Sequence, residues 1–220
     1  MEDIQKTDLK QKIKEEKKIL RAKIKSAIDL MTEEQRKKES DECFKMVIES
    51  KEFSEADAVL SYMATEREIS ADRICMKAME DGKILALPRT MPGTRLMDFY
   101  IMDGKKNLDE QIETGGWNIR EPSPTLPVFD AEKISGKNIL AIIPGVAFTK
   151  DGARLGHGKG FYDIYLKKLI SNCTTKVIKL TLTGLCFSTQ LLPRIPTSDH
   201  DVKMDSLMCL SSVPFCHCRA

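Results

Sequence analysis

Short apolar runs alternate with helical patterns along this chain, and no other feature limits the possible fold as strongly. Runs with the length and residue types of strands occupy residues 56–62, 84–87, 96–102, 139–143 and 176–186. Helical patterns fill the segments between them, at residues 9–30, 33–49, 71–80, 107–112 and 161–171. Because strands separated by helices pair in parallel, we expect an open, mostly parallel α/β sheet flanked by helices.

Length and composition fit one globular domain over residues 1–220, with residues 1–8 and 208–220 peripheral or disordered. The chain is 41% hydrophobic and 31% charged, and no apolar run approaches the roughly 20 residues that span a bilayer. The N-terminus lacks the apolar core of a signal peptide, and seven cysteines in no regular framework favour reduced thiols. We therefore expect a cytoplasmic protein. Cys216, His217 and Cys218 are adjacent and would chelate a metal poorly.

A glycine-rich segment follows the fourth apolar run and precedes the last helix. Five of the chain's twelve glycines lie from Gly145 to Gly160, with Arg154 and Lys159 among them. Glycine lets consecutive N–H groups point into one concavity and hold an anion, and a helix N-terminus adds a favourable dipole. The segment therefore predicts a phosphate site. The alternative is a simple connector, since glycine clusters often mark turns.

The spacing of these glycines excludes two familiar phosphate-binding motifs. A P-loop has four residues between its first glycine and Gly-Lys, whereas five separate Gly152 from Gly158. Gly160 also stands where the P-loop needs a Ser or Thr hydroxyl for the metal. A dinucleotide fingerprint reads G-x-G-x-x-G, whereas Gly156, Gly158 and Gly160 form G-x-G-x-G. The segment therefore belongs to neither class.

The first predicted helix carries an excess of positive charge. Residues 1–25 hold nine Lys or Arg and five Asp or Glu, a net of +4, whereas the whole chain has a net charge of +2. Such a run is often only a solvated face, and a nucleic-acid patch is disfavoured by the acidic remainder and by the lack of aromatic residues before Phe44. Lys17 and Arg21 lie one helical turn apart, so a third interpretation has both closing over a polyphosphate at the glycine segment.

In a parallel α/β sheet, ligands bind beyond the carboxyl ends of the strands, so the loops at those ends should converge. Tyr62, Met63 and Glu68 follow the first predicted strand, and Arg89 follows the second. Glu68 is alternatively a surface acid before a helix, where the dipole favours it. Trp117 is the single tryptophan, and it either pins a proline-rich loop or stacks on a flat ligand.

Two aspartates are candidate ligands for Mg²⁺. Asp163 falls in the first helical turn after the glycines, where a carboxylate either binds a cation beside phosphates or caps the helix. Asp199, His200 and Asp201 form a polar cluster of a kind that more often lies in a surface loop. Asp201 is a metal candidate only through its association with Asp163.

The segment PGVAFTKDGARLGHGKGFYD at 144–163 resembles the signature of the 5-formyltetrahydrofolate cyclo-ligase family, also called 5,10-methenyltetrahydrofolate synthetases. Further similar segments are KKILR at 17–21, LSYMATEREI at 60–69, LPR at 87–89, GGWNIREP at 115–122 and DVKMD at 201–205. The resemblance extends over most of the chain. It implies a fold akin to the sugar-phosphate isomerase and CoA-transferase group, and Mg-ATP-dependent conversion of 5-formyltetrahydrofolate to 5,10-methenyltetrahydrofolate.

The resemblance also implies residue roles. It makes Lys159 and Arg154 catalytic and assigns Mg²⁺ to Asp163 and Asp201. Its ATP contacts are Lys17, Lys18, Ile19, Leu20, Arg21, Arg154, Leu155, Gly156, His157, Gly158, Lys159, Gly160, Phe161 and Tyr162. Its substrate contacts are Met63, Glu68, Trp117, His157, Gly158, Lys159, Gly160, Phe161 and Tyr162. The implied partners are ATP and a reduced folate, with no nucleic acid and no membrane, and we expect a monomer.

Two positions depart from the family pattern. His157 lies where relatives often carry Arg or Tyr, so a contact there is weaker or pH-dependent. Phe161 lies where many have Tyr, so no hydroxyl role applies to it. Three other functions remain open, namely a folate-binding protein without turnover, an RNA-binding module led by the basic helix, and a small-molecule kinase. Retention of Lys159, Arg21 and Asp163 argues against the first.

Overall fold

A computed structural model describes residues 2–116, 119–134 and 136–210 of the chain. Its helices are α1 (Glu2–Asp29), α2 (Glu33–Ile48), α3 (Lys51–Glu55), α4 (Asp72–Glu80) and α5 (Phe161–Thr175), with 3₁₀ turns η1 (Asp109–Gln111) and η3 (Ser188–Gln190). Its strands are β1 (Ala58–Leu60), β2 (Ile84–Thr90), β3 (Met97–Ile101), β4 (Ile112–Thr114), β5 (Arg120–Pro122), β6 (Asn138–Ile143), β7 (Ala147–Phe148), β8 (Arg154–Leu155), β9 (Lys179–Leu185) and β10 (Ser206–Met208).

A six-stranded sheet forms the middle layer of the molecule, with strand order β10-β9-β6-β1-β2-β3. All neighbours from β10 to β2 pair in parallel, and among the described strands of this sheet β3 alone runs antiparallel to its neighbour. Two short ribbons, β4-β5 and β7-β8, lie outside the sheet. The predicted open, mostly parallel α/β sheet is therefore confirmed.

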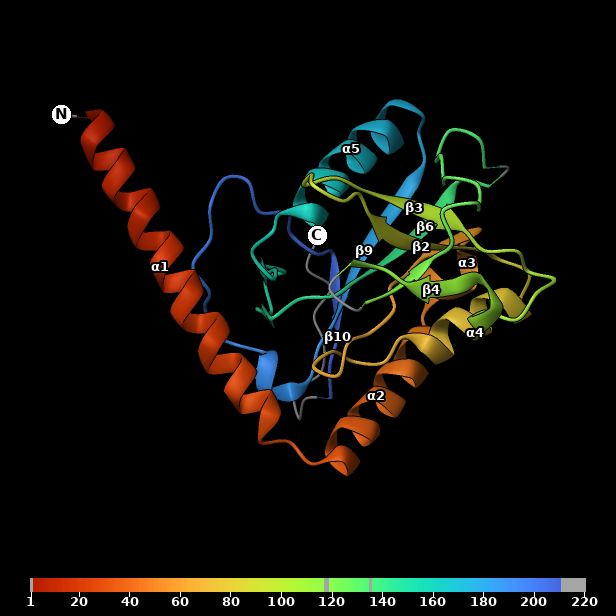
Figure 1. The fold of residues 1–220 in the computed structure, drawn as a ribbon, viewed down its shortest axis with the longest axis horizontal. Coiled ribbons are helices and arrows are strands. Elements are labelled where there is room, and N and C mark those ends of the chain that lie inside the picture. Colours follow the sequence, from red (N-terminus) through yellow and green to blue (C-terminus); the bar gives the residue numbers. More distant parts are fainter. Residues whose placement is uncertain (1, 117–118, 135, 211–220) are drawn as a thin grey trace.

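The central strand β6 divides the core between the two faces of the sheet. Ile139, Ala141 and Ile143 belong to the buried cluster that includes the inner side of α5. Leu140 and Ile142 belong to the cluster that includes the inner sides of α1, α2, α3 and α4. Helices therefore cover both faces, as Figure 1 shows. This double cover is why the strand sequences are continuous apolar runs and not alternating ones.

Helix boundaries agree with the sequence where a capping signal exists. Thr32 and Gln35 form the predicted capping box of α2, each side chain accepting from the other residue's backbone N–H. Gly82 follows α4 with φ of +70°, the left-handed conformation that ends a helix. Two other helix ends differ from the periodicity by several residues, since α1 begins at Glu2 and α5 continues to Thr175.

Several elements differ from the sequence expectations. β2 continues past Pro88 to Thr90, which is tolerated because β1 pairs with β2 only as far as Ala86. The helix expected near residue 110 is a single 3₁₀ turn. The helix α3 and the strand β10 were not predicted, because five and three residues carry too little periodicity.

The glycine segment connects the carboxyl end of β6 to the N-terminus of α5, as predicted. The ribbon β7-β8 folds the first part of the segment into a hairpin. At its turn, Gly152 has φ of +83°, and a Cβ there would overlap the carbonyl oxygen of Met204. The hairpin brings Arg154 on β8 back toward α5 and leaves residues 156–160 as the loop that leads into the helix.

Candidate active site

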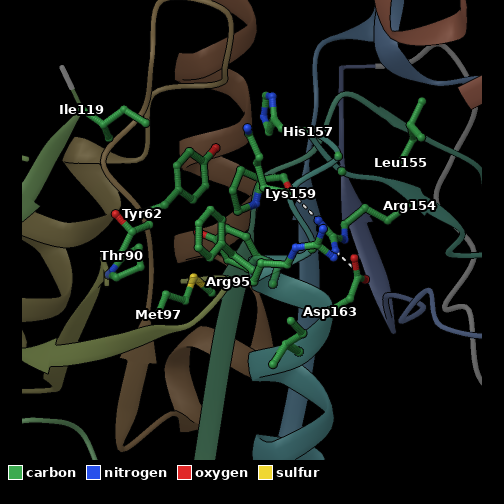
Figure 2. Close-up of a pocket in the computed structure, with 18 of the residues that line it drawn as sticks. Tyr62, Thr90, Arg95, Met97, Ile119, Arg154, Leu155, His157, Lys159 and Asp163 are labelled. Atoms are coloured by element: carbon green, nitrogen blue, oxygen red, sulfur yellow. Dashed lines mark hydrogen bonds and ion pairs between the residues drawn. The ribbon is translucent and has the colours of Figure 1, made fainter. Parts of the chain in front are cut away.

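A cavity of about 770 Å³ opens beside the ends of β1 and β6, where the sheet architecture predicted a ligand site. Its size is typical of a small-molecule site. The walls come from α1, the loop after β1, the hairpin β2-β3, the glycine segment, the start of α5 and the loop before β10. Figure 2 shows Tyr62, Thr90 and Met97 on one side of it and Arg154, Leu155 and Asp163 on the other.

Helix α1 lies against the glycine segment through Arg21. The Nε of Arg21 donates to the carbonyl oxygen of Gly156 over 2.8 Å. Gly158 has φ of +96°, and a Cβ at that position would lie 3.2 Å from the Arg21 guanidinium carbon. Burial lowers the pKa of Arg21, and the nearby Asp201 carboxylate partly opposes this shift. The glycine therefore permits both the turn and the close approach of the cation.

Lys17 lies one helical turn before Arg21 and ties α1 to the loop before β10. Its Nζ donates to Asp201 Oδ1 over 2.8 Å and to Ser198 Oγ over 3.1 Å. The Asp201 carboxylate also accepts from the backbone N–H of Ser198 over 2.7 Å. The Lys17 and Asp201 side chains are only 12% and 19% exposed, so this pair is shielded from solvent more than a typical surface salt bridge.

The remaining residues of segment 17–21 point away from the cavity. Lys18 faces solvent, with its Nζ 3.6 Å from Glu15 Oε1. Ile19 is 62% exposed, and Leu20 packs against the core cluster on the α1 side of the sheet. Within this segment the structure brings Lys17 and Arg21 to the cavity. The predicted ATP contacts of the other three stay predictions.

Arg154 and Asp163 form a buried ion pair at the base of the glycine loop. Arg154 Nη2 donates to Asp163 Oδ1 over 2.8 Å, and Nη1 donates to the Pro144 carbonyl over 3.3 Å. The Arg154 side chain is 2% exposed, and its Nε has no hydrogen-bond partner among the described residues. Asp163 Oδ1 also accepts from the backbone N–H of Val202 over 3.2 Å, which brings the two predicted metal ligands, Asp163 and Asp201, close together.

Glu68 lines the cavity as a nearly buried carboxylate, with its side chain 8% exposed. Its Oε2 accepts from the backbone N–H and the hydroxyl of Thr65, over 2.9 and 2.8 Å. Its Oε1 lies 3.0 Å from His157 Nε2. Burial by itself would raise the pKa of Glu68, but the His157 and Thr65 contacts outweigh it and the pKa is lowered. Glu68 is therefore ionised at neutral pH.

Aromatic and apolar side chains fill the space between these charged groups. Tyr62, Met63, Phe161 and Tyr162 all line the cavity. The Tyr62 hydroxyl donates to the Ile69 carbonyl over 2.7 Å, which fixes the loop that carries Glu68. Burial raises the pKa values of both tyrosines, so their hydroxyls stay neutral. The site can thus hold a flat, partly apolar ligand beside an anionic one.

One residue that was expected at this site, Arg89, does not line the cavity. Arg89 instead contacts the ribbon β4-β5, where its Nη1 lies 2.7 Å from Glu113 Oε1 and 2.7 Å from the Pro122 carbonyl. The reason is that β2 continues to Thr90, so Arg89 is within the strand and not in the loop after it. Trp117 and the segment Cys216, His217 and Cys218 lie outside the described residues.

A second wall of the cavity was missed by sequence reasoning. It includes Thr90, Arg95, Met97 and Ile119, and Lys167 on α5 faces the same cavity. No local signal marks Arg95 and Met97, because their position depends on β3 returning antiparallel beside β2. If β3 ran parallel to β2, residues 95 and 97 would lie at the other end of the sheet, away from the cavity.

In the part of the chain that the structure describes, no helix is long and apolar enough to span a membrane. A relative from Arabidopsis thaliana, 25% identical over 90% of this chain and 75% of its own length, is described as a mitochondrial 5-formyltetrahydrofolate cyclo-ligase. The cytoplasmic location therefore stays a prediction.

Comparison with known proteins identifies the relatives of the chain. The family model for the 5-formyltetrahydrofolate cyclo-ligase family matches residues 13–209. A probable 5-formyltetrahydrofolate cyclo-ligase from Caenorhabditis elegans is 32% identical, covering 89% of this chain and 93% of that protein. The solution structure of 5,10-methenyltetrahydrofolate synthetase from Aquifex aeolicus aligns with a TM-score of 0.70 at 25% identity, over 88% of this chain and 89% of that one. With a matching model over nearly the whole chain and the same fold, this protein belongs to the 5-formyltetrahydrofolate cyclo-ligase family.

Proposed function

We propose that this chain uses ATP to convert 5-formyltetrahydrofolate to 5,10-methenyltetrahydrofolate, with release of ADP and phosphate. Family membership supports the reaction, and one structural observation carries the assignment to this cavity. A single pocket joins a cluster of cations at a glycine loop to a buried carboxylate beside aromatic side chains. Such a site has one region for a polyphosphate and another for a ring system with hydrogen-bond donors.

The reaction needs activation by phosphate because an N-formyl group is a poor electrophile. Amide resonance deactivates its carbon, and its oxygen is a poor leaving group. Transfer of the γ-phosphoryl group of ATP to the formyl oxygen forms a phosphorylated imidate and ADP. Attack of N10 on the imidate carbon then closes the five-membered ring, and the phosphorylated oxygen departs as inorganic phosphate. Positioning and charge neutralisation supply most of the catalysis of such a transfer.

The cations of the glycine loop and of α1 suit the phosphoryl transfer. Arg21 and Lys17 approach from α1, and Arg154 and Lys159 come from the loop itself. Arg154 is held rigidly by Asp163 and the Pro144 carbonyl, so little reorganisation is needed when charge develops on the phosphate. We assign Arg154 and Lys159 to the transferred phosphoryl group.

Asp163 and Asp201 are the residues that would hold Mg²⁺. Both are carboxylates that line one cavity, and the bond from Val202 to Asp163 brings them close together. Among the described residues no group of three His, Cys, Asp or Glu side chains could hold a metal ion by itself, so Mg²⁺ at these two carboxylates would need phosphate oxygens of ATP as further ligands. When bound, the ion would neutralise charge on the phosphate oxygens.

The folate ring system fits the opposite region of the cavity. The ionised carboxylate of Glu68 can accept hydrogen bonds from ring N–H groups, and its two contacts with Thr65 fix its direction. Met63 and Tyr162 supply apolar surface for a flat ring. A stacking role for Trp117 remains part of the proposal.

We also propose that the chain acts as a monomer in the cytoplasm. Light scattering after size-exclusion chromatography tests the monomeric state, and imaging of the protein in its own cell tests the cytoplasmic location.

One assay tests the central proposal. Protein, Mg-ATP and 5-formyltetrahydrofolate are mixed, and the methenyl chromophore is followed by absorbance. We expect turnover by the wild type, a loss of about 100-fold or more in kcat for Lys159→Ala, and unchanged turnover for Lys168→Ala, an exposed lysine of α5. No chromophore from the wild type, or normal turnover by Lys159→Ala, would contradict the proposed mechanism.

This assay, together with measurements of ADP release and of RNA binding, separates the rival functions. A folate-binding protein without turnover would bind 5-formyltetrahydrofolate and form no chromophore. A small-molecule kinase would release ADP only with a different phosphoryl acceptor. An RNA-binding module would bind RNA with a steep dependence on salt concentration and would ignore folate.

A further inference from the structure

We propose that Arg95 and Lys167 form a carboxylate-binding subsite in this cavity, which holds the glutamyl end of the folate. The proposal rests on the proposed function and extends it to residues outside the glycine loop. Arg95 lies in the turn between β2 and β3, and Lys167 lies on α5. Both side chains line the cavity.

The first argument is the balance of charge around the cavity. Four of its cations already have partners within the protein, namely Lys17 with Asp201, Arg21 with Gly156, Arg120 with Asp72 and Arg154 with Asp163. Arg95 and Lys167 form no hydrogen bond or ion pair with any residue that the structure describes. Two unpaired cations that face a cavity create a positive potential, which favours an anionic part of the ligand.

The second argument is that the two cations come from elements that pack together. The rings of Phe99 on β3 and Tyr165 on α5 lie 4.7 Å apart between centroids, so α5 crosses over β3. Arg95 precedes β3 by two residues, and Lys167 follows Tyr165 by two. The packing therefore places the two elements that carry these cations side by side at the cavity.

Apolar side chains accompany the two cations. Ile164 and Lys167 are three residues apart on α5 and share one side of the helix. Met97 follows Arg95 by two residues, and both line the cavity with Ile164. This combination matches a p-aminobenzoyl-glutamate group, in which an aromatic ring is joined through an amide to two carboxylates.

The third argument concerns the region of the cavity from which the carboxylates of a ligand are excluded. Glu68 is ionised and nearly buried, so a carboxylate of the ligand would be repelled from that region. Glu68 is bonded to His157, and in the view of Figure 2 His157 lies at the top of the cavity, above Arg95 and Met97. A folate whose ring system contacts Glu68 would extend its glutamyl end toward Arg95. The phosphates of ATP would stay with the cations of the glycine loop and α1.

Equilibrium binding to Arg95→Gln, Lys167→Gln and the double variant tests the subsite. The probes are 5-formyltetrahydrofolate, the primary amide of 5-formyltetrahydropteroate, which has neither the glutamate nor a free carboxylate, and ATP, each measured by calorimetry. We expect each single substitution to weaken binding of the folate by roughly tenfold, as for one charge-assisted hydrogen bond. Binding of the pteroyl amide and of ATP should be unchanged. Lys168→Gln, on the same helix, is the matched control, and thermal unfolding checks that each variant is folded.

The outcomes distinguish the subsite from the function on which it rests. Equal losses for the folate and the pteroyl amide would show that the carboxylates are not the group bound, and a loss for ATP would assign these cations to phosphate. Unchanged folate binding in the double variant would refute the subsite while leaving the proposed function intact. A wild-type protein that binds neither folate nor ATP would overturn both.

Discussion

Buried charges at this site are held by specific partners, and these pairs set the chemistry of single residues. Arg154 is 2% exposed and is balanced by Asp163. Glu68 is 8% exposed and is balanced by His157 and Thr65. A charge in such a position costs several kcal/mol to bury unless its partners remain, so the partners are as important as the charged group.

Substitution of His157 by Ala should move the acid side of the pH profile upward. Hydrogen bonding and the charge of His157 lower the pKa of Glu68 against the effect of burial. Without His157, one of the contacts that oppose the effect of burial is lost. The pKa of Glu68 therefore rises, and the Glu68 carboxylate becomes protonated at higher pH. The logarithm of kcat/KM for the folate, measured between about pH 4 and pH 8, should fall at higher pH in the variant than in the wild type. Overlapping profiles would show that His157 does not control Glu68.

Glu68 should also contribute to stability in a pH-dependent way. Its pKa is lower in the folded protein than in the unfolded chain, so its contribution is fully present above the ordinary glutamate pKa of about 4.3 and is lost as pH falls through the folded value. The free energy of unfolding of Glu68→Gln should therefore be lower than that of the wild type at neutral pH and converge with it in acid. Urea unfolding at several pH values measures this, with Glu66→Gln, an exposed neighbour, as the control. A constant difference across pH would contradict it.

The glycine segment is the element whose shape makes the site possible. Its hairpin β7-β8 returns Arg154 to the base of the loop, and Gly160, with φ of +80°, begins α5 in the left-handed conformation. Since α5 starts directly after the loop, Asp163 lies in its first turn and reaches Arg154. One connection between a strand and a helix thus places both members of the ion pair.

Two glycine substitutions separate backbone strain from loss of space. Gly82 and Gly152 have similar φ values of +70° and +83°, but nothing lies within 4 Å of a Cβ built at Gly82. At Gly152 the added Cβ would overlap the Met204 carbonyl oxygen. We expect Gly82→Ala to lower the free energy of unfolding by about 1 kcal/mol. Gly152→Ala should lower it by about 3 kcal/mol because the overlap adds to the strain. Equal losses in urea unfolding would show that the loop before β10 moves aside.

At the scale of the whole molecule, the cavity joins distant parts of the chain. Lys17 near the N-terminus pairs with Asp201 near the C-terminus, and Arg21 bonds to Gly156. These contacts hold α1 across the site, while Figure 1 shows the N-terminal half of α1 extending beyond the body of the protein. A ligand that contacts both α1 and the glycine loop would therefore stabilise the whole fold.

Mg-ATP should raise the melting temperature of the protein by mass action. At about 100 times its Kd a ligand adds roughly 2.7 kcal/mol, which for a domain of this size corresponds to about 5–10 °C. Lys17→Met should show a smaller shift at the same ATP concentration, whereas Lys168→Met should respond like the wild type. Differential scanning fluorimetry measures all three. An equal shift in Lys17→Met would show that α1 does not contribute to ATP binding.

Much of the fold and part of the site follow from local sequence. The buried strand β6, the capping box of α2 and the position of the glycine segment were all predictable, because each depends on residues near one another in the chain. The antiparallel return of β3 was not, since nothing within residues 96–102 specifies its partner. For this reason the direction of Arg89 was predicted wrongly and Arg95 was missed.

The sequence by itself determined that this chain forms a mostly parallel α/β sheet with a glycine-rich loop that leads into α5, and the family signature in that loop indicated a reduced folate and ATP. Periodicity and backbone requirements of glycine are local properties, so they can be deduced from the order of residues. Only the tertiary structure decided which charges have partners. It pairs Lys17 with Asp201 and leaves Arg95 and Lys167 facing the cavity without a partner among the described residues. Pairing depends on distances between segments far apart in sequence, and folding alone sets those distances.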